Sequence, residues 1–143
     1  MSKERALTRA AVYLVLEQDG KVLLQLRKNS GFYDGYYGLP SGHWEYGEYL
    51  TDTMIREAKE EANIDLDKED LKLSLVWHSA KNKYIIFFMR SEQYSGNVRI
   101  NEPDKCEDLR FFEYSDLPEN IMPCISEALL AIKRGVKLIE GEV

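Results

Sequence analysis

Apolar runs separated by short polar turns mark the regular elements of this chain. Segment 7–16 is rich in β-branched and aromatic residues, and segment 22–26 is almost wholly apolar. Between them, the Asp19-Gly20 pair is typical of a tight hairpin turn. We therefore predict two antiparallel strands joined at this turn.

The next regular element is a helix that follows a long irregular segment. Segment 28–42 loses all apolar periodicity and interleaves glycine and proline with large aromatic residues, which predicts a loop. Segment 48–62 lacks glycine and proline and is rich in good helix formers. It ends before Asn63, a residue that tolerates the left-handed conformation of a helix C-terminal cap. These features predict a helix over 48–62.

The second half of the chain returns to strands and ends with another helix. Strands are expected, in chain order, over 71–77, 84–89 and 109–114. After a turn at 115–118, apolar residues recur at helical spacing over 123–134, and Gly135 ends the pattern. Strands before, between and after only two helices do not make repeated β-α-β units. They indicate an α/β fold, a mixed central sheet with one helix on each face, or α/β/α sandwich.

Composition and charge narrow the class of protein. The chain has 143 residues, 44% hydrophobic and 31% charged, which suits one globular domain over 1–143. A formal net charge of −6 argues against binding to duplex nucleic acid. The N-terminal segment is too short and polar for a signal peptide or membrane span, so we expect a cytoplasmic protein. Cys106 and Cys124 lack metal-binding spacing and are expected to be reduced, structural thiols.

Three carboxylates of the predicted helix share one face. Each residue advances by about 100°, so Glu57, Glu60 and Glu61 fall within an arc of roughly 100°. These carboxylates repel one another, and Glu60 and Glu61 also lie near the negative end of the helix dipole. A bound cation would offset both effects. Mg²⁺ prefers oxygen ligands and commonly bridges carboxylates to substrate phosphates. The alternative is that this is an ordinary solvated or protein-docking face, and the spacing alone does not decide between them.

The segment upstream adds a specific pattern. Segment 42–64 contains, in this order, Gly42, Glu48, the pair Arg56-Glu57 and the pair Glu60-Glu61. This pattern over 42–64 resembles the Nudix box, and segment 101–118 is similar to the downstream part of MutT-like Nudix proteins. The resemblance covers the chain from about Thr8 to Ile132 and implies a single Nudix hydrolase domain with a Nudix-type α/β/α sandwich.

The resemblance implies roles for individual residues. Glu57, Glu60 and Glu61 would bind the metal, Mg²⁺ or Mn²⁺, together with a main-chain carbonyl at Ser41 or Gly42. Arg56 and Glu48 would support them, and Glu57 or Glu60 would accept a proton from water. Family members often add a carboxylate from a later loop; Glu102 and Glu107 are candidates, and Glu107, nearer the following strand, is favoured.

Two positions depart from the family pattern, where glycine is more usual. Asn63 can still adopt the left-handed cap, whereas Ser41 alters the loop beside the metal. Neither change removes a carboxylate.

Substrate contacts are less sharply indicated. Arg27 and Lys28 could contact substrate phosphate, although such a pair is more often simply the exposed end of a strand. Tyr37 and its aromatic neighbours could stack on a base or simply pack the loop onto the core. His43 and His78 are isolated and are not expected to bind metal.

The implied reaction is attack of water on a phosphorus atom of a nucleoside diphosphate-linked small molecule. The downstream segment favours a nucleoside triphosphate, oxidised or noncanonical, cleaved to monophosphate and pyrophosphate. ADP-ribose, a nucleotide sugar, a dinucleoside polyphosphate or a capped RNA end are alternatives, as is a non-catalytic nucleotide sensor. The sequence does not decide whether two chains form a homodimer.

Overall fold

The computed structural model describes residues 3–143, which form eight β-strands and two α-helices. The strands are β1 (Arg9–Gln18), β2 (Lys21–Arg27), β3 (Tyr37–Gly38), β4 (Ser41–His43), β5 (Lys72–Ser79), β6 (Tyr84–Ser91), β7 (Cys106–Glu113) and β8 (Leu138–Glu140). The helices are α1 (Leu50–Ala62) and α2 (Pro123–Lys133), and single 3₁₀ turns lie at Lys68–Asp70 and Tyr114–Asp116. Every predicted strand and helix is present, with its ends shifted by a few residues.

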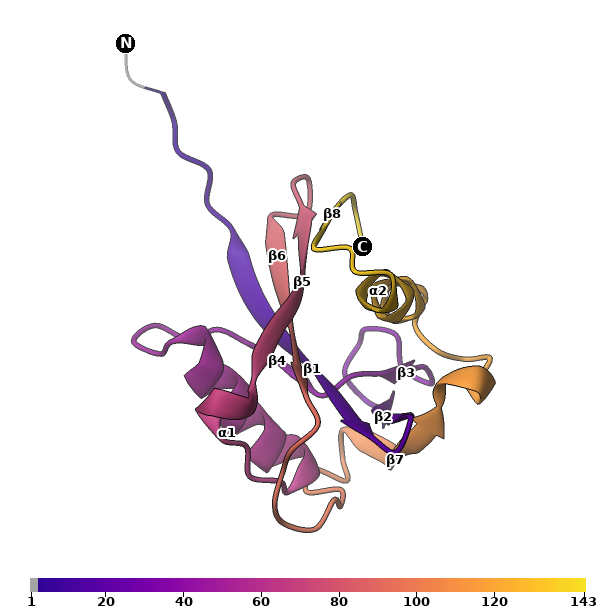
Figure 1. The fold of residues 1–143 in the computed structure, drawn as a ribbon. Coiled ribbons are helices and arrows are strands. Elements are labelled where there is room, and N and C mark those ends of the chain that lie inside the picture. Colours follow the sequence, from indigo (N-terminus) through magenta and orange to yellow (C-terminus); the bar gives the residue numbers. More distant parts are fainter. Residues whose placement is uncertain (1–2) are drawn as a thin grey trace.

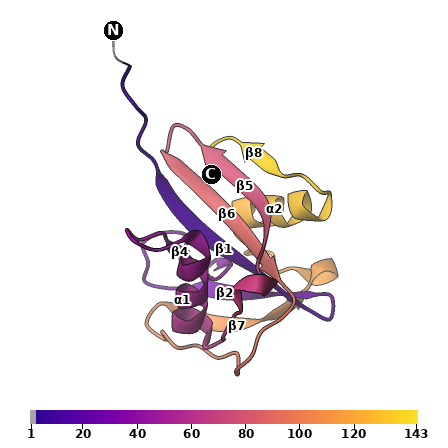
Figure 2. The same cartoon turned by 60° about the vertical axis from the view of Figure 1, so that its left-hand side comes forward.

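A mixed sheet separates the two helices (Figures 1 and 2). The main strand order is β3-β2-β1-β6-β5-β8, with β4 pairing β1 and β7 pairing β2. The β1–β6 and β5–β8 pairs are parallel, and the others are antiparallel. Helix α1 lies on one side of the sheet and α2 on the other. This confirms the predicted α/β/α sandwich.

The first hairpin is short, and its two strands soon separate. Asp19 and Gly20 both have positive φ, 53° and 75°, as a tight two-residue turn requires. The strands β1 and β2 are paired in register only from this turn to Glu17 and Val22. Beyond that point β1 pairs with β4 and β6, whereas β2 pairs with β3 and β7. Where β1 and β2 have separated, β4 pairs with β1 and lies next to α1.

Each side of the sheet has its own hydrophobic core. Along β1, Val12 and Leu14 pack in the core with α1, whereas Tyr13 and Val15 pack in the core with α2. Successive strand residues point to opposite faces, so one strand supplies both cores. On α1, Ala58 is fully buried in the core between the helix and the sheet. The position of the α1 backbone is thus fixed by its packing.

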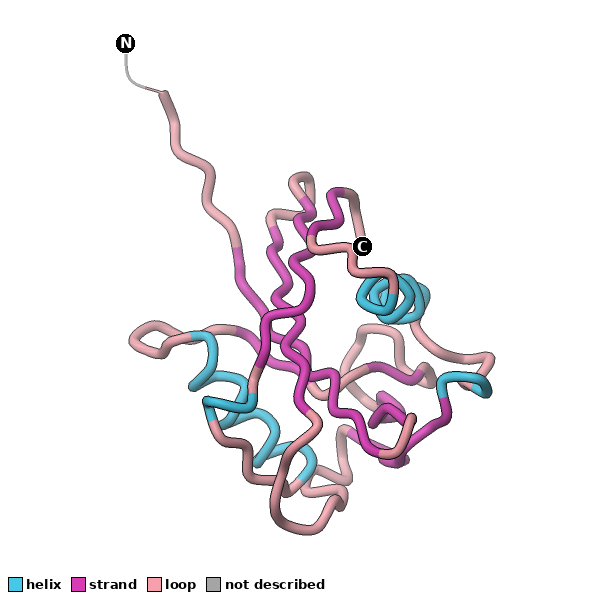
Figure 3. The backbone as a smooth tube through the Cα atoms, viewed as in Figure 1, coloured by secondary structure: helices cyan, strands magenta, loops and turns pink. Residues whose placement is uncertain are grey.

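Two parts of the prediction were incomplete. Segment 28–42 was predicted as a loop throughout, but it contains the short strand β3 and the start of β4 (Figure 3). Strand β8 was not predicted at all. These strands have two or three residues, too few for a period-two pattern, and they form because a longer strand offers free backbone groups beside them.

Helix α1 ends with a left-handed cap at Asn63, as predicted. This residue adopts the left-handed conformation, with φ of 60°, and its N–H bonds to the Lys59 carbonyl at 3.2 Å. Ile64, the next residue, turns back into the core and is fully buried. Within residues 3–143, no helix is long and apolar enough to cross a membrane.

Candidate active site

A bidentate ion pair joins α1 to the loop before it. Arg56 Nε lies 2.9 Å from Glu48 Oε2, and Arg56 Nη2 lies 3.0 Å from Glu48 Oε1. Thr53 Oγ1 donates another hydrogen bond to this carboxylate at 2.9 Å. The hydrogen bonds from Arg56 are the main reason that the pKa of Glu48 falls to about 2. Glu48 is therefore ionised near neutral pH and holds the guanidinium in a fixed orientation.

The same guanidinium positions Glu57. Arg56 Nη1 lies 2.8 Å from Glu57 Oε1. On its other side, Glu57 packs on the main chain of Gly42, where an added β-carbon would lie 2.2 Å from Glu57 Cδ. Burial raises the pKa of Glu57, and the nearby charges of Glu60 and Glu102 raise it further against the effect of Arg56. Position 42 therefore needs glycine because the loop approaches this carboxylate so closely.

Glu61, one helical turn beyond Glu57, is held by the loop rather than by Arg56. The main-chain N–H of Ser41 donates a hydrogen bond to Glu61 Oε2 at 2.9 Å. Burial raises the pKa of Glu61 to about 8, and repulsion from Glu57 and Glu102 adds to the rise. Every residue except proline has a main-chain N–H, so serine at position 41 does not weaken this contact.

A later loop brings a further carboxylate to the cluster. Asn101 docks this loop on the end of α1, since its Nδ2 lies 2.9 Å from the Lys59 carbonyl oxygen. The next residue, Glu102, lines a cavity of about 170 Å³ together with Glu61 and Arg27. Its charge also raises the pKa values of Glu57 and Glu61.

The structure brings Glu102, and not the favoured Glu107, to the other carboxylates. Leu26 of β2 pairs with Asp108, whereas Arg27 pairs with Cys106, so Glu107 has no partner across this strand pair. Such an extra residue forms a β-bulge. Glu107 is exposed there and lines neither cavity beside Glu61.

The carboxylates suit a hard divalent ion. Glu57, Glu61 and Glu102 offer only oxygen donors, and burial together with repulsion from neighbouring carboxylates raises the pKa of each. A cation placed among them would relieve that repulsion. In the part of the chain that the structure describes, no three acidic, histidine or cysteine side chains already converge as a coordination shell. Mg²⁺ does not need one, since it retains several waters and takes one or two carboxylates.

A cleft of about 580 Å³ opens beside Glu61. Tyr13 and Tyr84, which line it, also pack against the core on the α2 side of the sheet. Glu61, Ser41 and Gly42 form the edge next to α1. The remainder of the lining contains rings and cations, among them Tyr13, Tyr84, Phe32, Arg9, Arg27 and His43. The cleft therefore combines anionic, cationic and aromatic groups within one volume, as ligand sites commonly do.

Comparison with known proteins identifies the family. The NUDIX domain model matches residues 6–130. The chain belongs to the Nudix family. The predicted Nudix box, with its loop and α1, thus forms the carboxylate edge of the cleft.

Curated relatives have several named activities. An ADP-ribose pyrophosphatase from Methanocaldococcus jannaschii is 37% identical over 132 residues, which covers 82% of this chain and 73% of the relative. An NAD-capped RNA hydrolase NudC from Pseudomonas putida strain W619 is 30% identical over 105 residues, covering 73% of this chain and 37% of the relative. The chain therefore spans little more than a third of the length of the NudC relatives.

A solved structure has a similar fold over nearly its full length. It is a MutT NUDIX hydrolase from Burkholderia pseudomallei, with a TM-score of 0.77 and 29% sequence identity. The alignment covers 86% of this chain and 96% of that one. The Nudix fold predicted from the sequence is confirmed.

The structure gathers most, but not all, of the residues predicted for the Nudix site. Glu60 is half-exposed and lies 3.4 Å from Arg56 Nη1 at the rim of the cluster. Arg27 lines the cleft, and its Nε donates a 2.7 Å hydrogen bond to the Phe32 carbonyl. Lys28, which follows Arg27, is not part of the cleft lining.

Tyr37, a predicted substrate contact, lies elsewhere. It is buried in the core beneath α2, packs edge-to-face on Phe112 and donates its hydroxyl hydrogen to Asp108. The rings that do line the cleft include Tyr13 and Tyr84, which the sequence analysis did not select. The period of two along the first strand, which puts Arg9, Ala11 and Tyr13 on one face, is the signal that would have found Tyr13.

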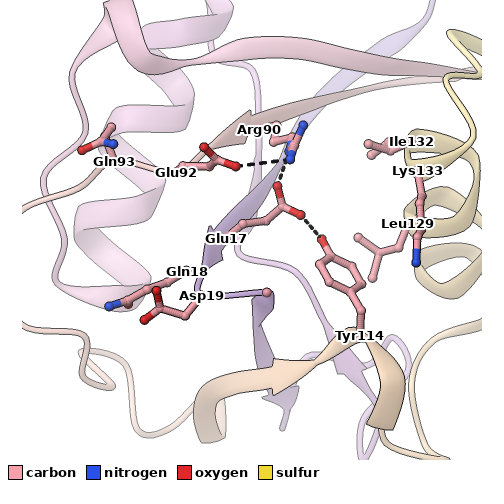
Figure 4. Close-up of a pocket in the computed structure, with 11 residues that line it drawn as sticks. Glu17, Gln18, Asp19, Arg90, Glu92, Gln93, Tyr114, Leu129, Ile132 and Lys133 are labelled. Carbon is pink, nitrogen blue, oxygen red and sulfur yellow. Dashed lines mark hydrogen bonds and ion pairs between the residues drawn. The ribbon is translucent and has the colours of Figure 1, made fainter.

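A further cavity, of about 670 Å³, has no residue of the Nudix box (42–64) in its lining. Figure 4 shows the residues that line it. Its centre is a closed polar network in which Glu17 accepts hydrogen bonds from Arg90 and Tyr114. Arg90 also pairs with Glu92 at 3.4 Å. Arg90 already neutralises Glu17, and Asp19, the lining carboxylate without an ion pair within residues 3–143, is exposed to solvent. This cavity therefore lacks the partly buried, mutually repelling carboxylates of the Nudix site.

Proposed function

We propose that this protein hydrolyses the diphosphate linkage of a nucleoside diphosphate derivative in a reaction that requires a divalent metal ion. One observation carries the proposal: Glu61 is partly buried at the edge of a cleft that Arg27 also lines, and the charge of Glu57, one helical turn away, repels it. Such carboxylates bind a divalent cation because it relieves their repulsion. The bound cation, with Arg27, then attracts the negative charge of a polyphosphate.

Glu57 and Glu61 would hold the metal, and the chain orients both. Arg56 fixes Glu57, Glu48 fixes Arg56, and the Ser41 amide fixes Glu61. A bound divalent ion neutralises charge on phosphate oxygens and makes water more acidic. Glu60 and main-chain oxygen near Gly42 remain candidate ligands at the rim, as the family resemblance implies.

Water attacks one phosphorus atom of the diphosphate, the bond to the bridging oxygen breaks, and the other phosphate leaves with that oxygen. The water proton passes to a carboxylate. Glu102 suits this role because its side chain accepts no hydrogen bond from residues 3–143, whereas Arg56 holds both Glu57 and Glu60. Burial also raises the pKa of Glu102, which brings it closer to that of an effective base at neutral pH.

For the substrate, we favour ADP-ribose or a similar nucleoside diphosphate sugar over the nucleoside triphosphate expected from the sequence. Three cationic side chains, Arg9, Arg27 and Lys105, line the two cavities that also contain Glu61 and Glu102. A neutral sugar adds no charge and suits the aromatic lining, whereas a third phosphate needs additional cations. The name of the Methanocaldococcus relative points the same way.

The test is product analysis with a substrate panel in Mg²⁺ or Mn²⁺. Wild-type protein should convert ADP-ribose to AMP and ribose 5-phosphate with a higher kcat/KM than any nucleoside triphosphate. Preferential release of pyrophosphate from a triphosphate would instead support the MutT-type reaction. Binding of metal and nucleotide without turnover of any panel member would indicate a non-catalytic sensor.

A further inference from the structure

The Tyr13 hydroxyl differs from those of the other buried or partly buried tyrosines because it makes no hydrogen bond to the described part of the chain. The hydroxyls of Tyr37 and Tyr114 bond to Asp108 and Glu17, and the Tyr84 hydroxyl lies 3.2 Å from His43 Nδ1. The Tyr13 hydroxyl has no hydrogen-bond partner within residues 3–143. No buried side-chain oxygen or nitrogen in that range lacks a partner, so this hydroxyl must be accessible to solvent. Tyr13 lines the cleft beside Glu61, and the cleft is where its hydroxyl becomes accessible.

The position of this side chain is set by the sheet. Tyr13 pairs across β1 and β4 with Ser41, the residue whose N–H holds Glu61. Its ring packs against Phe88 of β6 with a centroid separation of 5.3 Å. A packed ring on a central strand has little rotational freedom to lose on binding. The hydroxyl is therefore held in a fixed position on the strand residue that pairs with Ser41, the residue that binds Glu61.

The surroundings keep this hydroxyl protonated. Burial is the main cause that raises the pKa of Tyr13 above its usual range, and the negative charge of Glu61 acts in the same direction. Arg27 opposes this effect without overcoming it. At any working pH the group is thus a neutral hydrogen-bond donor beside a cation and an anion.

We propose that Tyr13 donates a hydrogen bond to a non-bridging oxygen of the substrate diphosphate and so determines how the diphosphate lies in the cleft. The assignment rests on the proposed function and adds a substrate contact to it. A neutral donor binds an anionic oxygen by a charge-assisted bond, yet it adds no positive charge that would compete with a metal ion for Glu61. Arg27 then neutralises the phosphate, and Tyr13 fixes its orientation.

The test uses Tyr13→Phe, which keeps the ring against Phe88 and removes one oxygen atom. The probe is adenosine 5′-(α,β-methylene)diphosphate with Mg²⁺, which carries a diphosphate that cannot be hydrolysed at the bridge. Titration calorimetry should give a Kd raised about 10- to 100-fold in Tyr13→Phe, the range for a hydrogen bond to a charged group. Adenosine, which lacks phosphate, should bind both proteins equally.

The matched control is Tyr94→Phe. Its hydroxyl bonds to Gln18 at 2.7 Å outside the cleft, so its loss should leave probe binding unchanged. Equal probe affinity in wild type and Tyr13→Phe would overturn the assignment, as would equal weakening of adenosine. If wild-type protein does not bind the probe at all, the proposed function itself fails, and the Tyr13 assignment falls with it.

Discussion

Gly42 and Glu57 are in direct contact, and the geometry leaves no room for a side chain at position 42. An added β-carbon would lie 2.2 Å from both Cγ and Cδ of Glu57. Gly42→Ala should therefore displace the Glu57 carboxylate while leaving the sheet intact. We expect kcat to fall about 100-fold, since a shift of about 1 Å in a catalytic group has that effect.

Gly141→Ala is the control for this substitution. Gly141 has open space around its Cα, so a methyl group there meets nothing within 4 Å. Activity and thermal stability should match wild type. If Gly42→Ala retained full activity, Glu57 would not need the position in which the loop holds it.

The two candidate loop carboxylates make a second matched pair. Glu102→Gln should lower kcat by about 100-fold or more, the lower end of the effect of general acid–base catalysis. Glu107→Gln should leave kcat close to wild type, because Glu107 is exposed at a bulge away from Glu61. A large loss of kcat in Glu107→Gln, with kcat close to wild type in Glu102→Gln, would assign the proton-accepting role to Glu107 and exclude Glu102.

The Arg56–Glu48 pair predicts a pH dependence of stability. Arg56 lowers the pKa of Glu48 from 4.5 to about 2, so folding favours the ionised form. This contribution is fully present above pH 4.5 and is lost as pH falls towards 2. Thermal unfolding should show a lower Tm for Glu48→Gln near neutral pH, and its difference from wild type should shrink on acidification.

Glu45→Gln serves as the comparison for that measurement. Glu45 also faces Arg56, but at 3.7 Å and with 66% of its side chain exposed. An ion pair of that kind contributes little. A Tm difference for Glu48→Gln that stays constant between pH 7 and pH 2.5 would contradict the account of this pair.

Asn63 provides a test of helix termination. It has φ of 60°, and its Nδ2 donates a 2.9 Å hydrogen bond to the Asn97 carbonyl. Asn63→Ala should lower the free energy of unfolding by about 1–2 kcal/mol, because alanine tolerates this backbone conformation poorly. Asn63→Gly, which relieves the strain but loses the hydrogen bond, should be nearly neutral. Equal losses in urea unfolding would mean that the hydrogen bond, and not the backbone, determines the effect.

The parts of the site that the sequence predicted well lie on one continuous segment. Glu57, Glu60 and Glu61 share a helix face, and the spacing of Arg56 and Glu48 matches their observed ion pair. Glu48 lies in the loop before α1, so its ion pair followed from the matched Nudix-box pattern and not from helical periodicity. The helix backbone determines the shared face of the three glutamates. The cap at Asn63 follows from the same local chemistry.

The parts that were missed depend on contacts between distant segments. Glu102 joins the cluster because Asn101 docks its loop on α1, and Glu107 is excluded by a bulge in the pairing of β7 with β2. Tyr37 was one of several aromatic residues in one loop, and its burial depends on the positions of α2 and β7 in the assembled fold. No local pattern specifies these outcomes, since each requires the sheet to be assembled.

The most direct test of the central claim is to measure metal binding and turnover in the same variants. Mn²⁺ binding by electron paramagnetic resonance and ADP-ribose hydrolysis should be compared among wild type, Glu57→Gln and Glu61→Gln. We predict that both variants stay folded, bind Mn²⁺ more weakly and lose at least about 1,000-fold in kcat/KM, the upper range for removing one electrostatic group from an active site. Wild-type Mn²⁺ affinity and turnover in both variants would contradict the assignment of these glutamates as the metal site.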